Sequence, residues 1–159
     1  QWFYSMIGND QSDEPFLDEA LTTYMTAIYF KEINGNAGYN GYLDYRSSLK
    51  ESLAERFTLY QGESILRHIS EYQEGYGYLV YYHGPTLYRY YVEYFLENDT
   101  DRFLDALQVY YTAYNKDIAT IEEFFTLLEE STGEVGTKEW LYEQANDLQD
   151  LNQESREWD

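Results

Sequence analysis

Residues 15–29 read PFLDEALTTYMTAIY, and the apolar side chains in this stretch recur mostly at spacings of three and four. That period places them on one face of an α-helix. Pro15 suits the first helical position, where a backbone N–H has no partner within the helix, and Asp13 or Glu14 suits the cap and the helix dipole. We therefore expect a helix that begins at Pro15 and presents one apolar stripe: Phe16, Leu17, Ala20, Leu21, Tyr24, Ile28 and Tyr29.

The helical period continues along most of the chain, with interruptions at glycine-rich and polar segments. The run NGNAG at 34–38 should end the first helix, because glycine and asparagine disfavour helix interiors. Residues 65–69 suit a short helix, which a loop through Gly75 and Gly77 should follow. Pro85 should then lie in the first turn of the next helix, since proline lacks the N–H that a helix interior uses.

Two helix boundaries stand out in the C-terminal part. Thr120 with Glu123 forms the pattern of a capping box, in which each side chain accepts the other residue's backbone N–H. Gly133 should end that helix, and a last helix should run from near Thr137 through Leu148. No useful stretch alternates apolar and polar residues as a half-buried strand would. The sequence thus predicts an all-α helical bundle.

The chain is strongly acidic, with a formal net charge of -20 from 30 acidic and 10 basic residues. Nucleic acids and anionic membrane surfaces are disfavoured partners, because binding them needs clustered Lys and Arg. The absence of cysteine excludes disulfides and thiolate metal sites, and no apolar run is long enough to span a bilayer. Most of the 20 tyrosines lie on helical stripes, where the ring fills the core and the hydroxyl reaches a polar group.

Three segments carry a resemblance to a known family. They are QWFYSMIGNDQSDEPFLDEALTTY at 1–24, VYYHGPTL at 80–87 and DRFLDALQVYYTAYNKDIATIEEFFTLLEESTG at 101–133. Together they resemble the gluzincin zinc aminopeptidases of the aminopeptidase N and leukotriene A4 hydrolase type. In that family a helix carries HExxH, and a Glu that is separated from the second His by eighteen intervening residues completes the zinc site. Taking Gln1 as the residue after that His, the same spacing leads to Glu19.

The resemblance implies a role for each matching residue. Glu19 would be a zinc ligand, and Asp18 before it would orient that ligand. Tyr81 matches the Tyr of the family's Tyr-x-x-Gly segment, whose hydroxyl donates to the oxyanion that forms during peptide hydrolysis. The sequence departs from the family pattern at two positions. His83 stands where the family often has Lys, and Ala20 stands where it more often has Gly.

The resemblance also implies what the chain is part of. Residues 1–148 would be the helical half of a zinc-peptidase catalytic domain, followed by an acidic tail at 149–159. The parent protein would be a zinc metallopeptidase that acts on peptide substrates. We expect it to be an aminopeptidase. This chain contains no HExxH, so we expect it to be inactive alone and to hold zinc weakly or not at all. Its cleft face should pack against the missing N-terminal part of the domain, or promote self-association when exposed. The sequence does not determine the cellular location of the protein. We prefer an extracellular or cell-surface location to the cytoplasm.

Other interpretations come from different classes of protein. The main alternative is a non-catalytic helical binding module that keeps the family fold, and a second is an unrelated acidic, tyrosine-rich bundle. The pair of His68 and Glu71 has the spacing of two ligands on one helix face, but such pairs are common on exposed helices. Residues 98–100 form a glycosylation sequon, which matters only in a eukaryotic secretory protein.

Overall fold

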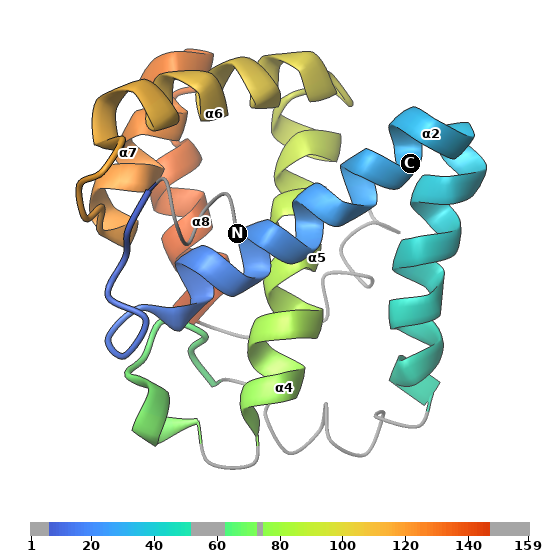
Figure 1. Ribbon diagram of the computed structural model, residues 1–159, viewed down its shortest axis with the longest axis horizontal. Helices are drawn as coiled ribbons and strands as arrows, with labels where there is room; N and C mark the ends of the chain where they lie inside the picture. Colours follow the sequence, from blue (N-terminus) through green and yellow to red (C-terminus); the bar gives the residue numbers. More distant parts are fainter. Residues whose placement is uncertain (1–6, 52–62, 73–74, 147–159) are drawn as a thin grey trace.

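The structure confirms the all-α prediction. This computed structural model describes residues 7–51, 63–72 and 75–146, with side chains described as far as Leu43 in the first range; the predicted acidic tail lies outside them. No β-strand occurs among these described residues. They contain one isolated β-bridge, between Gly8 and Ile118. The elements in chain order are α2 (Pro15–Glu51), η1 (Ile69–Glu71), α4 (Tyr76–Tyr78), η3 (Leu79–His83), α5 (Gly84–Tyr90), η4 (Tyr91–Phe95), α6 (Thr100–Tyr114), α7 (Ile121–Thr132) and α8 (Thr137–Asn146) (Figure 1).

A continuous helical rod forms the centre of the bundle. It consists of α4, η3, α5 and η4, which follow one another without a break (green to yellow in Figure 1). The first half of α2 crosses this rod and packs on η3 and α5. On the other side α6 packs on α7, α7 packs on α8, and α8 returns to α5 and η4. The contact between α2 and the rod brings together the elements that carry the predicted site residues Glu19 and Tyr81.

Several predicted helix boundaries are confirmed. Helix α2 begins at Pro15, and α5 has Pro85 in its first turn. The capping box at the start of α7 is formed, since the Thr120 side chain accepts the N–H of Glu123 and the Glu123 carboxylate accepts the N–H of Thr120. Gly133 ends α7 in the left-handed conformation, with φ 73°, which glycine adopts without a Cβ clash.

The NGNAG run ends the first helical half as predicted, because Gly35 leaves the helical conformation; a second helical half follows directly and continues to Glu51. Two other predicted boundaries are wrong. Gly77 lies in α4 rather than in a loop, and the helical turn near Ile69 is limited to η1. Local glycine content predicted a loop at Gly77, but tertiary packing on neighbouring elements overrides that preference.

The rod contains two π-helical turns, η3 and η4, that the sequence analysis did not anticipate. In η3 the N–H of Gly84 donates to the carbonyl of Leu79, five residues earlier. Pro85 explains the position of this turn, because proline has no N–H for the carbonyl of Tyr81 and its ring would crowd that carbonyl in a regular helix. Such π turns frequently occur at functional sites.

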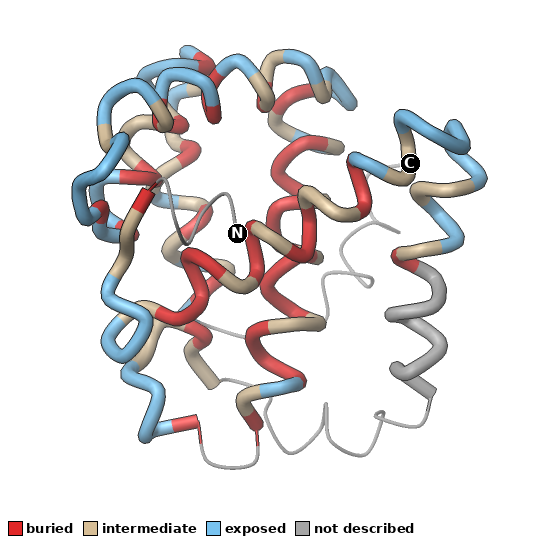
Figure 2. Tube along the Cα trace, viewed as in Figure 1, coloured by how far each residue is buried: buried red, intermediate tan, exposed pale blue. Residues whose placement is uncertain are grey.

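The core is aromatic and lies between α2, the rod, α6 and α7 (buried segments in Figure 2). The Phe16 ring stacks on Tyr88 with centroids 5.5 Å apart, and the Tyr110 and Phe124 centroids lie 4.6 Å apart. Tyrosine therefore serves as core filler, as its helical spacing predicted. None of the described helices is both long enough and apolar enough to cross a membrane.

Tyr88 is an exception to the rule that buried hydroxyls are paired. Its side chain is 0% exposed, and its hydroxyl has no hydrogen-bond partner. An unpaired buried donor costs roughly 1–3 kcal/mol. We therefore expect Tyr88→Phe to raise the free energy of unfolding by about 1 kcal/mol in urea denaturation.

A matched control is Tyr91, whose hydroxyl lies 3.0 Å from Oγ1 of Thr132. Tyr91→Phe removes a formed hydrogen bond and should lower the free energy of unfolding by about 1 kcal/mol. If both substitutions destabilise the protein equally, the Tyr88 hydroxyl is satisfied and this account of the core is wrong.

Candidate functional site

Glu19 lies near the start of α2, and the segment before the helix fixes that start. The backbone N–H groups of Ser12 and Asp13 donate to the Asp10 carboxylate, which closes a tight turn. The Glu14 carboxylate then accepts the N–H of Ile121 at 3.0 Å, so the beginning of α2 is tied to the beginning of α7. These contacts fix the N-terminal end of the helix that carries Glu19.

Tyr81 comes from the π turn η3 and meets Glu19 across the contact between α2 and the rod. The Tyr81 hydroxyl faces the Glu19 carboxylate, and burial and this carboxylate together raise the pKa of the hydroxyl. Both side chains are half-buried, so the pair is neither sealed in the core nor fully in solvent. The structure thus brings together the predicted metal ligand and the predicted oxyanion donor.

Tyr76 is a third member of this group that sequence reasoning missed. Its ring meets the ring of Tyr81 edge to face, with centroids 5.7 Å apart, and its hydroxyl also raises the pKa of Tyr81. Tyr76 and Tyr81 are five residues apart, a spacing that a regular helix of 3.6 residues per turn does not align. The π turn between them brings both rings to one side, so only knowledge of that turn could have predicted the contact.

Gly84 allows α2 to approach the rod closely beside this pair. A Cβ atom built on Gly84 would lie 2.4 Å from the Cβ of Ala20 and 3.2 Å from the Phe16 ring. Such short separations do not occur between real side chains, so this position requires glycine. The glycine of the Tyr-x-x-Gly segment therefore has a physical purpose, since it sets the distance between the helices that carry Glu19 and Tyr81.

Asp18 is buried, with 7% of its surface exposed. Its Oδ2 accepts a hydrogen bond of 2.6 Å from the Nε2 of Gln11, in the segment that leads into α2. This bond anchors Asp18 to the turn before the helix. Its proposed role in orienting Glu19 stays a prediction.

The two histidines lie in different settings. His68 caps η1, where its Nδ1 accepts the N–H of Ser70, and its Nε2 lies 3.8 Å from the Asp13 carboxylate. That capping bond gives His68 a structural purpose. His83 is buried in η3, two residues after Tyr81. Across the ranges 7–51, 63–72 and 75–146, no group of three or more His, Cys, Asp or Glu side chains could hold a metal ion.

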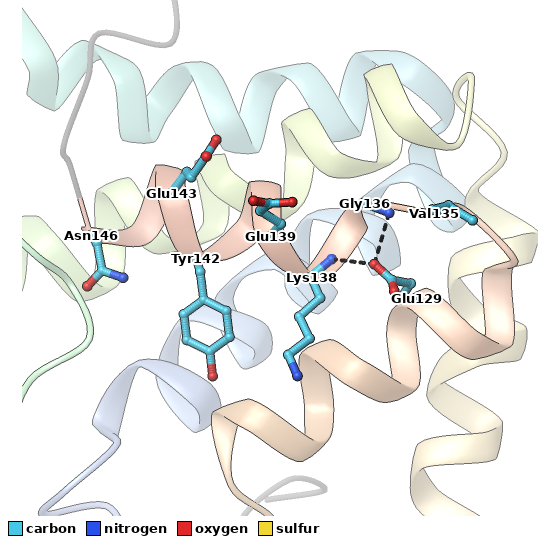
Figure 3. Close-up of a pocket in the computed structure, with 8 residues that line it drawn as sticks. All are labelled: Glu129, Val135, Gly136, Lys138, Glu139, Tyr142, Glu143 and Asn146. Atoms are coloured by element: carbon cyan, nitrogen blue, oxygen red, sulfur yellow. Dashed lines mark hydrogen bonds between the residues drawn. The ribbon is translucent and has the colours of Figure 1, made fainter.

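A shallow hollow of about 670 Å³ lies over α7 and α8, and none of the predicted site residues lines it (Figure 3). At its edge the Glu129 carboxylate accepts the N–H groups of Gly136 and Lys138, each at 3.0 Å. This carboxylate caps the first turn of α8. These bonds give Glu129 a structural role. We therefore keep the pair of Glu19 and Tyr81, and not this hollow, as the candidate site.

Burial dominates the electrostatics of the tyrosines. It raises the pKa of Tyr81, and the adjacent Glu19 carboxylate raises it further, because an anionic phenolate would be repelled there. Burial likewise raises the pKa of Tyr24 and Tyr88 well above the ordinary value of 10.0. Tyr81 therefore remains a protonated donor at neutral pH and well above it.

These shifts predict a loss of stability in alkali. Above about pH 10 the unfolded tyrosines lose their protons while the folded ones keep them, so the unfolded state is favoured as the pH rises towards the folded pKa values. Each fully buried tyrosine should lower the free energy of unfolding by up to about 1.4 kcal/mol per pH unit in that window. Urea unfolding between about pH 9 and pH 12 measures the slope, and Tyr88→Phe should make it shallower. A slope that Tyr88→Phe leaves unchanged would contradict the shift at that residue.

No protein-family model, curated protein or solved structure matches this chain. The functional argument therefore depends on the geometry of Glu19, Tyr81 and their neighbours.

Proposed function

We propose that this chain is the helical part of the catalytic domain of a zinc metallopeptidase that hydrolyses peptide bonds, with an aminopeptidase as the preferred type. The observation that supports the proposal is that the contact between α2 and η3 places the Tyr81 hydroxyl beside the Glu19 carboxylate. The family resemblance selected these two residues separately, Glu19 by spacing and Tyr81 by the Tyr-x-x-Gly motif, on segments far apart in the chain. Their meeting is what a shared site requires.

The described residues do not make a complete zinc site. Glu19 offers one carboxylate, whereas a catalytic zinc needs three protein ligands, and no suitable cluster of three occurs in the described ranges. The remaining ligands would have to come from the rest of the parent protein. We therefore derive no chemical step through the metal and consider only what this chain's own side chains do.

The proposed role of Tyr81 is hydrogen-bond donation during peptide hydrolysis. When water adds to the peptide carbonyl, its oxygen becomes negatively charged, and a hydroxyl already in place stabilises that charge. Tyr81 suits the role because its raised pKa keeps the proton on the oxygen. The contacts with Glu19 and Tyr76 orient the hydroxyl before substrate arrives, which lowers the cost of reorganisation.

The charge of the chain supports the proposed substrate class. A formal net charge of -20 attracts cationic groups, and the free amino end of a peptide is one. The proposed partners are therefore a peptide and the remainder of the catalytic domain.

One observation favours the second candidate, a non-catalytic helical binding module. The Glu19 carboxylate already faces the Tyr81 hydroxyl, and the described residues form no group of three or more side chains that could hold a metal ion. In such a module the pair would fasten α2 to the rod and would have no reactant to act on.

Glu19→Gln in the full-length protein separates the two candidates. The amide keeps the size of the side chain and can still accept from Tyr81, but it is a poor zinc ligand. We expect zinc content and peptidase activity to fall together, by at least about 10-fold, with little change in unfolding. Glu71→Gln is the matched control and should change neither quantity, because Glu71 is an exposed residue of η1. Full zinc and full activity in Glu19→Gln would leave the module as the better account.

A further inference from the structure

Helix α2 turns a sharp corner at Gly35 (Figure 1). Gly35 has φ 63° and ψ -159°, while the rest of the helix keeps helical angles on both sides. This region of backbone conformation is essentially restricted to glycine, because a Cβ would clash there. The peptide link between Asn34 and Gly35 therefore lies at the end of one helical half rather than inside a helix.

The corner is closed by contacts between its two halves. A Cβ built on Gly38 would lie 2.4 Å from the carbonyl oxygen of Phe30, so the backbone of the second half lies against that of the first. The Lys31 ammonium lies 5.5 Å from the centre of the Tyr39 ring, and the Tyr39 hydroxyl lies 3.4 Å from that of Tyr24.

Two Asn-Gly pairs occur on α2, and they form a matched comparison. Asn34 with Gly35 lies at the corner, whereas Asn40 with Gly41 lies inside the second helical half. All four residues are exposed. The pairs have the same residue types and the same access to water, so they differ in backbone conformation.

Asn-Gly pairs are the sequences most open to a reaction with their own backbone. The amide nitrogen of the glycine attacks the side-chain carbonyl carbon of the asparagine, a new C–N bond closes a five-membered ring, and ammonia leaves. Water then opens the ring at either carbonyl and leaves an aspartyl or an isoaspartyl link. The attack requires the backbone between the two residues to rotate, which a helix interior resists because its hydrogen bonds must break first.

We propose that Asn34 is a site of spontaneous deamidation in the folded protein, whereas Asn40 is protected. The corner supplies the reason, since Gly35 has already left the helical conformation and the helix hydrogen bonds end there. The reactant besides the chain itself is water. This modification is independent of the proposed peptidase chemistry.

The reaction has a structural consequence at the corner. It adds a negative charge, and an isoaspartyl link also lengthens the backbone by one carbon. Because Gly38 lies in backbone contact with Phe30, the corner has no room for a longer link. The modified chain should therefore lose the contact between Tyr24 and Tyr39, while Glu19 lies about 22 Å away along the helix and should be unaffected.

Incubation of the purified chain in warm, mildly alkaline buffer tests the proposal. Trypsin releases one peptide, 32–46, that contains both pairs. Each conversion of an amide to an acid increases the mass of this peptide, and fragmentation in a mass spectrometer shows which asparagine has reacted. A parallel incubation in strong denaturant gives the intrinsic rate at each asparagine. We expect the ratio of folded to unfolded rate to be near one at Asn34 and several-fold lower at Asn40.

Asn34→Gln is the control variant, because glutamine closes the larger ring much more slowly. It should abolish conversion at residue 34 and leave the slow conversion at Asn40 unchanged. Equal protection of the two asparagines in the folded chain, or faster conversion at Asn40, would overturn the proposal.

Discussion

Tyr81→Phe is expected to lower the turnover of the full-length protein by about a hundred- to a thousandfold. The substitution removes one hydroxyl and keeps the ring, so the edge-to-face contact with Tyr76 should survive. The lost donor acts mainly on the transition state, where the carbonyl oxygen becomes charged. We therefore expect kcat to fall while KM stays nearly constant, as steady-state kinetics with a peptide substrate would measure.

Tyr82→Phe is the internal control for this effect. Tyr82 is the next residue of η3, and its ring stacks on Tyr78 with centroids 5.2 Å apart, an interaction that phenylalanine keeps. The loss of turnover in Tyr82→Phe should therefore be far smaller than the loss in Tyr81→Phe. Equal losses from the two substitutions would remove Tyr81 from the mechanism.

Gly84→Ala is expected to destabilise the chain by about 3 kcal/mol, because the new methyl group overlaps Ala20 between two packed helices. Either α2 or the rod must move, and the movement separates Glu19 from Tyr81. Chemical unfolding measures the destabilisation directly.

Two variants make this prediction specific. Gly77→Ala places the same methyl group on the rod where nothing lies within 4 Å, so it should be neutral or stabilising. Ala20→Gly combined with Gly84→Ala removes the clash, and the double variant should recover most of the lost stability. Additive costs in the double variant would show that the contact between these residues does not limit the approach of the helices.

Much of the fold was predictable because its boundaries are encoded locally. Pro15, the capping box of Thr120 with Glu123, and Gly133 each act through their own backbone conformation and the hydrogen bonds of one helix end. Such signals do not depend on what the helix packs against. For the same reason the apolar stripes, which have the helical period, predicted an all-α bundle.

The rest of the fold depends on contacts that lie far apart in the sequence. The corner at Gly35 continues into a second helical half because Gly38 packs against the backbone at Phe30. Glycine content placed Gly77 in a loop, although it lies in α4. The π turn η3 shifts the register of the rod, so a regular helical period gave no sign that Tyr76 meets Tyr81.

The candidate site was predictable in part. Spacing and local motif selected Glu19 and Tyr81, and the structure brings these two residues together. What spacing could not supply is the reason for their approach, which is the missing Cβ of Gly84 against Ala20. The zinc role of Glu19 depends on ligands that the described residues do not provide, and it stays a prediction.

Anomalous X-ray scattering at the zinc edge, measured on crystals of the full-length protein, tests the central claim most directly. The account predicts a zinc peak about 2 Å from a carboxylate oxygen of Glu19. It also predicts that the Tyr81 hydroxyl faces the open coordination position. A full-length protein without zinc, or a zinc ion bound away from Glu19, would contradict it.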